Sequence, residues 1–293
     1  MSMRVVVVSR IPQVVGGFDA VVREAGHEVV ALLTNRIVLG GGGPGDAMGE
    51  LVFGAPADLD VLLPARRETI APLLAAVQPD LVVCMGFPWR IPPDALAVPP
   101  LGWLNGHPSL LPEHRGPIPV AWAIRQGDDE IGVTFHRMDA DLDTGPIFSQ
   151  RVYPLGDLEP PDVFYPRMGQ VVGEALAEAL GRLAAGDEGT VQRDGGSYES
   201  FFTADDVWLD LSRPATEVHR LVWSWRFAMA PDTTSGALLE LEGKPVRVLA
   251  TSLTEVEGAR RLECGDAPLW VVETEELSEE AASSTSVPAA STH

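Results

Sequence analysis

The first thirty-five residues constrain the fold most. Residues 4–9 (Arg-Val-Val-Val-Val-Ser) form a short apolar run, and a predicted loop rich in Pro and Gly follows at 12–17. Helical spacing at 18–25 and a second apolar run at 27–34 come next. A strand, a crossover helix and a second strand make a βαβ unit, whose strands are parallel and whose crossover is right-handed. With a further buried strand at 81–85, the sequence predicts an α/β fold with a mostly parallel, Rossmann-like sheet.

The later part of the chain changes in character. Alternating apolar and polar residues at 131–138 and 147–154 predict strands with one solvated face, and 161–185 contains a long amphipathic helix. Beyond a segment rich in Gly, Asp and Ser, a helix at 217–225 and several short apolar runs predict a small β-rich domain. The predicted boundaries are 1–186 for the catalytic domain, 187–202 for a linker, 203–273 for the small domain and 274–293 for a disordered acidic tail.

The charge balance argues against a nucleic-acid partner. The chain has 21 basic and 42 acidic residues, which give a formal net charge of −21. Part of the excess lies in the predicted tail, yet the body is acidic without it. Nucleic-acid binding depends on Lys and Arg contacts to phosphate, and an acidic surface repels a polyanion.

Other sequence features exclude several classes of protein. No apolar run approaches the roughly 18 residues of a transmembrane helix, and the first run is too short for a signal-peptide core. We therefore expect a cytoplasmic protein without a membrane partner. Cys84 and Cys264 are isolated, and no His/Cys/Asp cluster has zinc spacing, so no metal is expected.

Two short segments contain residues suited to acyl transfer. Asn105-Gly106-His107-Pro108-Ser109-Leu110-Leu111-Pro112 follows a predicted strand at 101–104, and Asp-Leu-Asp-Thr-Gly occupies 141–145. Asn105 can donate a hydrogen bond to a developing oxyanion, His107 can transfer a proton near neutral pH, and Asp143 can hold that histidine. Each residue alone also fits an ordinary structural role. Together they predict a site for moving an acyl group onto an amine.

The same segments carry a resemblance to a known family. Asn-Gly-His-Pro-Ser-Leu-Leu-Pro-Glu-His-Arg-Gly-Pro-Ile-Pro and Met-Asp-Ala-Asp-Leu-Asp-Thr-Gly resemble the folate-dependent formyltransferases. That family includes enzymes that act on methionyl-tRNA, on aminosugars and on hydroxyornithine. The resemblance implies N10-formyltetrahydrofolate as formyl donor, catalysis by Asn105, His107 and Asp143, and a C-terminal domain like a small β-barrel (OB-like). The chain departs from the family pattern at 224–231, where an Asn-Pro-Trp-Pro-Gly-type turn is expected.

The resemblance also implies where the donor binds. The pterin is expected against the loop after the strand at 81–85 and against the loop at 139–143. The expected folate contacts are Met85, Gly86, Phe87, Trp89, Ile91, Leu104, Asp139, Ala140 and Asp141. Ser109 and Arg115 are weaker candidates for substrate contacts, and His136 is expected to be structural.

Three acceptors of the formyl group compete. The favoured one is a small-molecule amine, such as an aminosugar nucleotide or an N-hydroxyornithine-like amine, in secondary metabolism. The alternatives are methionyl-tRNA and water, the latter giving a formyltetrahydrofolate hydrolase. The tRNA enzymes carry a basic insertion after the second strand, whereas residues 35–51 hold only Arg36 as a cation, with Asp46 and Glu50. A homodimer is left open.

Overall fold

The structure is a computed structural model that describes residues 2–35, 51, 55–56, 58–156, 158–228 and 236–277. Most of the segment 35–51 and of the predicted tail therefore lies outside the described residues. The chain divides into two compact units. The first comprises Met1–Gly116, Glu130–Pro154 and Asp162–Tyr198, and the second comprises Pro117–Asp129, Leu155–Pro161 and Glu199–His293.

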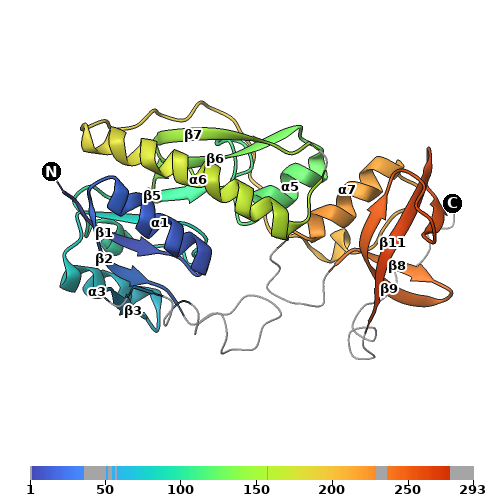
Figure 1. The fold of residues 1–293 in the computed structure, drawn as a ribbon, viewed down its shortest axis with the longest axis horizontal. Helices are drawn as coiled ribbons and strands as arrows, with labels where there is room; N and C mark the ends of the chain where they lie inside the picture. Colours follow the sequence, from blue (N-terminus) through green and yellow to red (C-terminus); the bar gives the residue numbers. More distant parts are fainter. Residues whose placement is uncertain are drawn as a thin grey trace. The chain divides into compact units, whose positions relative to one another are not determined.

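The first unit contains a seven-stranded sheet in the order β3-β2-β1-β4-β5-β6-β7 (Figure 1). The strands in chain order are β1 (Arg4–Val8), β2 (Glu28–Leu33), β3 (Asp60–Leu62), β4 (Leu81–Cys84), β5 (Trp103–His107), β6 (Glu130–Arg137) and β7 (Ile147–Pro154). The first five are parallel to one another, β6 runs antiparallel to β5, and β7 runs antiparallel to β6 and so in the direction of the first five. The predicted mostly parallel α/β fold is confirmed. The strand order reverses between β1 and β4, and open parallel sheets bind ligands beside the carboxyl ends of strands at such a point.

Helices cover both faces of this sheet. In Figure 1, α1 (Pro12–Glu24) and α6 (Pro161–Ala184) lie on one face, and α3 (Ile70–Val77) lies on the other. The short 3-10 helix η1 (Arg67–Thr69) precedes α3, and α4 (Pro93–Leu96) packs with α3. Val6 and Val8 pack against Ile70 and Leu74. All four valines of β1 are buried, as expected for a central strand covered on both faces.

Helix α1 begins six residues earlier than the sequence predicted. Pro12 stands in its first turn, where the fixed φ of proline suits a helix start, and Gly16 and Gly17 lie inside the helix. The buried side chains Val15, Phe18 and Val22 recur at helical spacing. Burial of this apolar face outweighs the weak helix propensity of two glycines.

The second unit contains a four-stranded antiparallel sheet in the order β10-β11-β9-β8. Its strands are β8 (Leu238–Leu241), β9 (Lys244–Ser252), β10 (Arg260–Glu263) and β11 (Pro268–Glu276), and its helices are α5 (Pro119–Gln126), η2 (Ala204–Asp206) and α7 (Ala215–Trp225). Val218 and Val222 of α7 join a core with Leu239, Val248 and Leu269 of the sheet. The four-stranded sheet confirms the prediction of a small β-rich C-terminal domain.

Two details differ from the predicted boundaries. Helix α5 was expected in the catalytic domain, but it groups with the C-terminal unit, where the Arg125 guanidinium lies 5.1 Å from the Trp122 ring centre and 5.0 Å from that of Phe202. The tail was expected from residue 274, but β11 continues to Glu276 and pairs there with Val246 of β9.

No helix of the described residues is long and apolar enough to cross a membrane.

Candidate active site

Strand β5 positions the first two residues of the site. Alternate residues of a strand point to the same face, so Asn105 and His107 project together. Gly106 between them faces the opposite side, where an added Cβ would lie 2.9 Å from the Phe135 ring. The sequence predicted that Asn105 and His107 follow the strand, whereas both lie within it, because β6 extends the pairing (Asn105 opposite His136).

Asp143 comes from the loop between β6 and β7. Its φ is 59°, a left-handed conformation that Asp tolerates better than most residues. The Gly116 amide donates to its Oδ2 at 3.1 Å, and the Gln192 side chain donates to its carbonyl oxygen at 2.9 Å. The loop closes tightly, since a Cβ on Gly145 would lie 1.9 Å from the Arg137 carbonyl oxygen. The aspartate is thus held from both its side chain and its backbone.

The structure brings the three residues predicted to be catalytic together and places His136 beside them. His107 Nδ1 lies 3.7 Å from Asp143 Oδ1, and His136 Nε2 lies 3.6 Å from the same oxygen. His136 Nε2 is also 3.2 Å from Asn105 Nδ2. His136 was expected to be structural. The signal that could have found it is the period of β6, which places the buried polar residues Thr134 and His136 on one face.

Hydrogen bonds indicate where the imidazole protons reside. His107 Nε2 is 2.8 Å from the carbonyl oxygen of His114, which can only accept, so this nitrogen carries a proton. The neutral ring therefore has its lone pair on Nδ1, which faces Asp143. His136 Nδ1 is 3.0 Å from the Arg137 carbonyl oxygen, which can only accept, so Nδ1 carries a proton, and in this tautomer Nε2 accepts from the Asn105 amide. This bond turns the amide nitrogen of Asn105 toward His136 and leaves its second N–H for a ligand.

Burial and charge determine the protonation states of His107 and Asp143. Burial lowers the pKa of His107, an effect that the nearby Asp143 carboxylate partly offsets. Burial alone would raise the pKa of Asp143, but the nearby rings of His107 and His136 and the Gly116 amide together lower this pKa to about 2. At neutral pH the resting site therefore holds a neutral His107 beside an ionised Asp143.

The two weaker substrate candidates have internal partners. Ser109 is fully buried, and its hydroxyl donates to the Glu113 carbonyl oxygen at 2.7 Å. Arg115 donates to the Asp143 carbonyl oxygen at 3.2 Å and to the Gln192 side chain at 2.9 Å. Both side chains thereby hold the loops around His107 and Asp143, and their contact with substrate stays a prediction.

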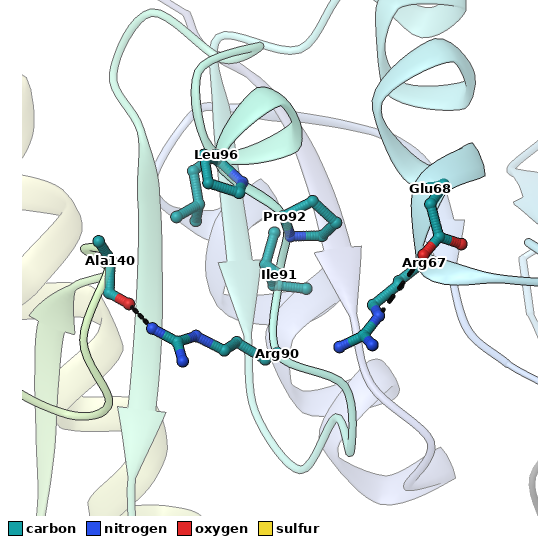
Figure 2. A pocket seen from close by; sticks show the side chains of 8 residues that line it. Arg67, Glu68, Arg90, Ile91, Pro92, Leu96 and Ala140 are labelled. Carbon is teal, nitrogen blue, oxygen red and sulfur yellow. Dashed lines mark hydrogen bonds and ion pairs between the residues drawn. The ribbon is translucent and has the colours of Figure 1, made fainter.

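The residues expected to contact folate divide into two groups. A hollow of about 380 Å³ in the first unit is lined by Arg67, Glu68, Arg90, Ile91, Pro92, Pro93, Leu96 and Ala140 (Figure 2). Ile91 and Ala140 are thus the two expected residues that line it, and the Arg90 side chain donates to the Ala140 carbonyl oxygen. Arg67 and Arg90 also line this hollow, although neither was predicted as a folate contact from the sequence.

The other expected residues lie outside the lining of this hollow. Phe87 and Trp89 meet edge to face with ring centres 5.6 Å apart, and both pack on the core beneath β4. Asp139 accepts from the Thr144 hydroxyl at 2.9 Å and from the Asp141 amide at 3.1 Å, and so shapes its own loop. Of the remaining expected contacts, Met85 and Gly86 lie in the turn that follows β4, and Leu104 belongs to β5.

Neither a metal cluster nor a reactive thiol appears in the described part of the chain. No group of three or more His, Cys, Asp or Glu residues there could hold a metal ion. Burial, together with the nearby Asp143 carboxylate, raises the pKa of Cys84 to about 12, so its thiol is protonated and inert.

Comparison with known proteins defines the class. A Formyl transferase family model matches residues 56–180. The methionyl-tRNA formyltransferase of Roseiflexus sp. (strain RS-1) is 32% identical over 263 residues, covering 85% of this chain and 77% of that protein. That of Pseudomonas fluorescens (strain Pf0-1) is 39% identical over 188 residues, 64% of this chain and 57% of that protein. The chain belongs to the folate-dependent formyltransferase family, although it matches less than two thirds of the Pseudomonas relative.

Solved structures show the same fold at low identity. HypX from Aquifex aeolicus in complex with tetrahydrofolic acid matches with a TM-score of 0.67 at 20% identity, covering 96% of this chain and 45% of that one. A sugar N-formyltransferase from Shewanella sp FDAARGOS_354 matches with a TM-score of 0.63 at 19% identity, covering 84% of this chain and 96% of that one.

Proposed function

We propose that this protein transfers the formyl group of N10-formyltetrahydrofolate to the amine of a small molecule. The observation that carries the proposal is the cluster of Asn105, His107 and Asp143 at the carboxyl end of β5, with 3.7 Å between His107 Nδ1 and Asp143 Oδ1. An amide donor beside a proton-transfer pair is the set that attack of an amine on a formyl carbon requires.

Each residue has a defined task. Asn105 donates an N–H to the oxygen that becomes negative in the tetrahedral intermediate, and loss of such a donor costs about 10²–10³ in rate. The His107–Asp143 pair receives the proton that the attacking amine loses, because neutral His107 has its lone pair on the side of Asp143. Once protonated, His107 is stabilised by the carboxylate, and the pair returns the proton to N10 of the donor as the bond between N10 and the formyl carbon breaks and tetrahydrofolate leaves. His136 keeps the amide of Asn105 in the donating orientation.

The hollow lined by Ile91 and Ala140 suits the donor. Apolar side chains of Ile91, Pro92 and Leu96 can pack against a flat ring, and backbone groups near Ala140 can pair with its polar edge. The guanidinium groups of Arg67 and Arg90 at the same hollow can neutralise the glutamate carboxylates of a folate (Figure 2). The volume of about 380 Å³ is in the range of pockets for small ligands.

The net charge of −21 supports a small acceptor, since steering a polyanion to this surface is unfavourable. The fold similarity to a sugar N-formyltransferase over nearly its whole length agrees with an aminosugar. On this proposal the protein acts in the cytoplasm on a biosynthetic amine.

The second candidate is formylation of methionyl-tRNA, which the names of the Roseiflexus and Pseudomonas relatives favour.

The test offers N10-formyltetrahydrofolate with several amines in parallel: nucleotide-linked aminosugars, hydroxylated ornithine and lysine, and charged initiator tRNA. Mass spectrometry then identifies any product that has gained one CO unit. A formylated small amine supports the proposal, and formylated tRNA supports the second candidate. Release of formate with no formylated amine indicates hydrolysis and overturns both. The Asp143→Asn variant serves as the control for enzyme-dependent transfer.

A further inference from the structure

Three buried polar atoms lie directly after strand β2. Thr34 is 0% and Asn35 is 1% exposed. Across the described part of the chain, neither Thr34 Oγ1 nor the two polar atoms of the Asn35 amide has a hydrogen-bond partner. Ser9, which is equally buried at the end of the adjacent strand β1, does have one, because its Oγ accepts from the Ile11 amide at 3.1 Å. Buried polar side chains are nearly always paired, so an exception requires an explanation.

The strand register places these atoms along the same edge of the sheet as the catalytic residues. Leu33 of β2 lies opposite Val8 of β1, Val8 opposite Cys84 of β4, and Cys84 opposite Asn105 of β5. The carboxyl ends of the four strands therefore form one row, with the reversal of strand order between β1 and β4 inside it. Strands are about 4.8 Å apart, so β2 is about 14 Å from β5 along this row.

The residues that follow β2 are separate from those that line the hollow assigned to the donor. Ile91 and Ala140 of that lining follow β4 and β6, and Arg67 and Glu68 belong to the segment that follows β3. Thr34 and Asn35 follow β2, which lies on the other side of β1 from β4, and neither residue is in the lining. A molecule that presents its amine to Asn105 from the side of β1 therefore extends along the row of strand ends toward Thr34 and Asn35.

We propose that Thr34 and Asn35 bind the end of the acceptor that is distant from its reacting amine. This inference rests on the proposed small-molecule formyl transfer. An amide and a hydroxyl each offer a donor and an acceptor, so they fit an uncharged group that presents both, such as the amide edge of a nucleobase. The row requires about 10–14 Å between amine and distal group, which follows from three strand spacings. A nucleotide-linked aminosugar has that length, and a hydroxyornithine does not.

Two near-isosteric variants, Thr34→Val and Asn35→Leu, test the proposal. Each removes polar atoms that have no hydrogen-bond partner among the residues that the structure describes, so the melting temperature is expected to stay equal or to rise. The KM for a nucleotide-linked aminosugar is expected to rise about three- to tenfold in Thr34→Val and more in Asn35→Leu, with kcat unchanged. The matched control is Ser149→Ala, which loses a bond from Oγ to the Ala175 carbonyl oxygen at 2.6 Å. It is expected to lower the melting temperature and to leave KM unchanged.

The opposite pattern overturns the inference. If both variants lose thermal stability as Ser149→Ala does, while KM is unchanged, the atoms are structural and pair with water. If the wild-type protein formylates only short amines, the proposed function stands and this inference fails. If no amine is formylated, the binding role is tested without turnover, by calorimetric titration of the wild type and of Asn35→Leu with a nucleotide-linked aminosugar. Equal affinity of the wild type and Asn35→Leu then rejects the binding role.

Discussion

At the scale of single residues, Asp143 combines burial with a negative charge. His107, His136 and the Gly116 amide lower the pKa of its carboxyl to about 2 against the effect of burial, so the group is ionised throughout the neutral range. We predict that Asp143→Asn lowers kcat by about ten- to a thousandfold, because the change keeps the shape and removes the charge beside His107. Steady-state kinetics with the formyl donor at saturation measure kcat of the wild type and of Asp143→Asn. Unchanged tetrahydrofolate affinity is the control, and a near-normal kcat contradicts the mechanism.

His136 permits a second test at this scale. Its Nε2 accepts from the Asn105 amide at 3.2 Å and thereby orients the oxyanion donor. We predict that His136→Leu lowers kcat by about tenfold or more, whereas His136→Gln, whose carbonyl can accept the same bond, retains more activity. Tetrahydrofolate affinity should not change in either variant. Equal kcat values for the two variants would show that the hydrogen bond is irrelevant.

The residues of the candidate site were predictable to different degrees. Asn105, His107 and Asp143 stand in contiguous motifs, and their chemical complementarity is visible in the sequence. His136 joins them only through the antiparallel pairing of β5 with β6, and Arg67 reaches the hollow through a helix start far from either motif. Such residues depend on strand order and register, which a linear pattern does not specify.

At the scale of elements, β11 departs most from its sequence pattern. Glu273, Thr274, Glu275 and Glu276 have the composition of a solvated tail, yet they pair with β9, and Arg247 forms an ion pair with Glu275. The ladder to a neighbouring strand outweighs low strand propensity here. Strands β3, which has three residues, and β10, which is largely exposed, were not predicted from the sequence. Neither has a clear alternation of apolar and polar residues.

This strand gives a truncation test. We predict that ending the chain after Val272 lowers the melting temperature by several degrees, because β9 loses its partner residues 273–276. Ending it after Leu277 removes only the composition-predicted tail and should have no effect on the melting temperature or on activity. Differential scanning calorimetry of both truncations measures the contrast. Equal melting temperatures for the two would mean that the end of β11 contributes no stability.

The contact of α7 with β9 makes stability depend on pH. Burial, with a smaller effect of Arg220, lowers the pKa of His219 to about 4, and its Nδ1 lies 2.8 Å from Thr251 Oγ1. The unfolded chain, with an ordinary pKa of about 6.5, binds the proton first as pH falls. This contribution to stability is therefore complete above about pH 6.5 and is lost progressively toward pH 4.

We predict a larger decrease in the free energy of unfolding between pH 7 and 5 for the wild type than for His219→Gln. His107, whose pKa burial also lowers, acts in the same direction in both proteins, so the difference isolates His219. Urea denaturation at the two pH values measures it. Equal decreases in the two proteins would contradict the assignment.

At the scale of the whole molecule, the charge of −21 has a measurable consequence. If the acceptor is a small amine, an excess of bulk tRNA should inhibit formylation by less than about twofold, since phosphate binding requires cationic contacts. The assay adds tRNA to the small-amine reaction at low salt, with the matched monovalent salt as control. Strong inhibition that disappears as salt is raised would instead indicate a tRNA-binding surface and favour the second candidate function.

The grouping of α5 with α7 also has a consequence in time. The ribosome completes α5 about 90 residues before it begins α7. Synthesis proceeds at about 5–20 residues per second, so roughly 5–20 s pass between the completion of α5 and the start of α7. Until α7 has been made, the apolar side chains of α5 cannot pack against it. During this interval the nascent chain exposes a surface that chaperones recognise. Slower translation between the two helices should therefore lower the yield of native protein more than the same delay after α7.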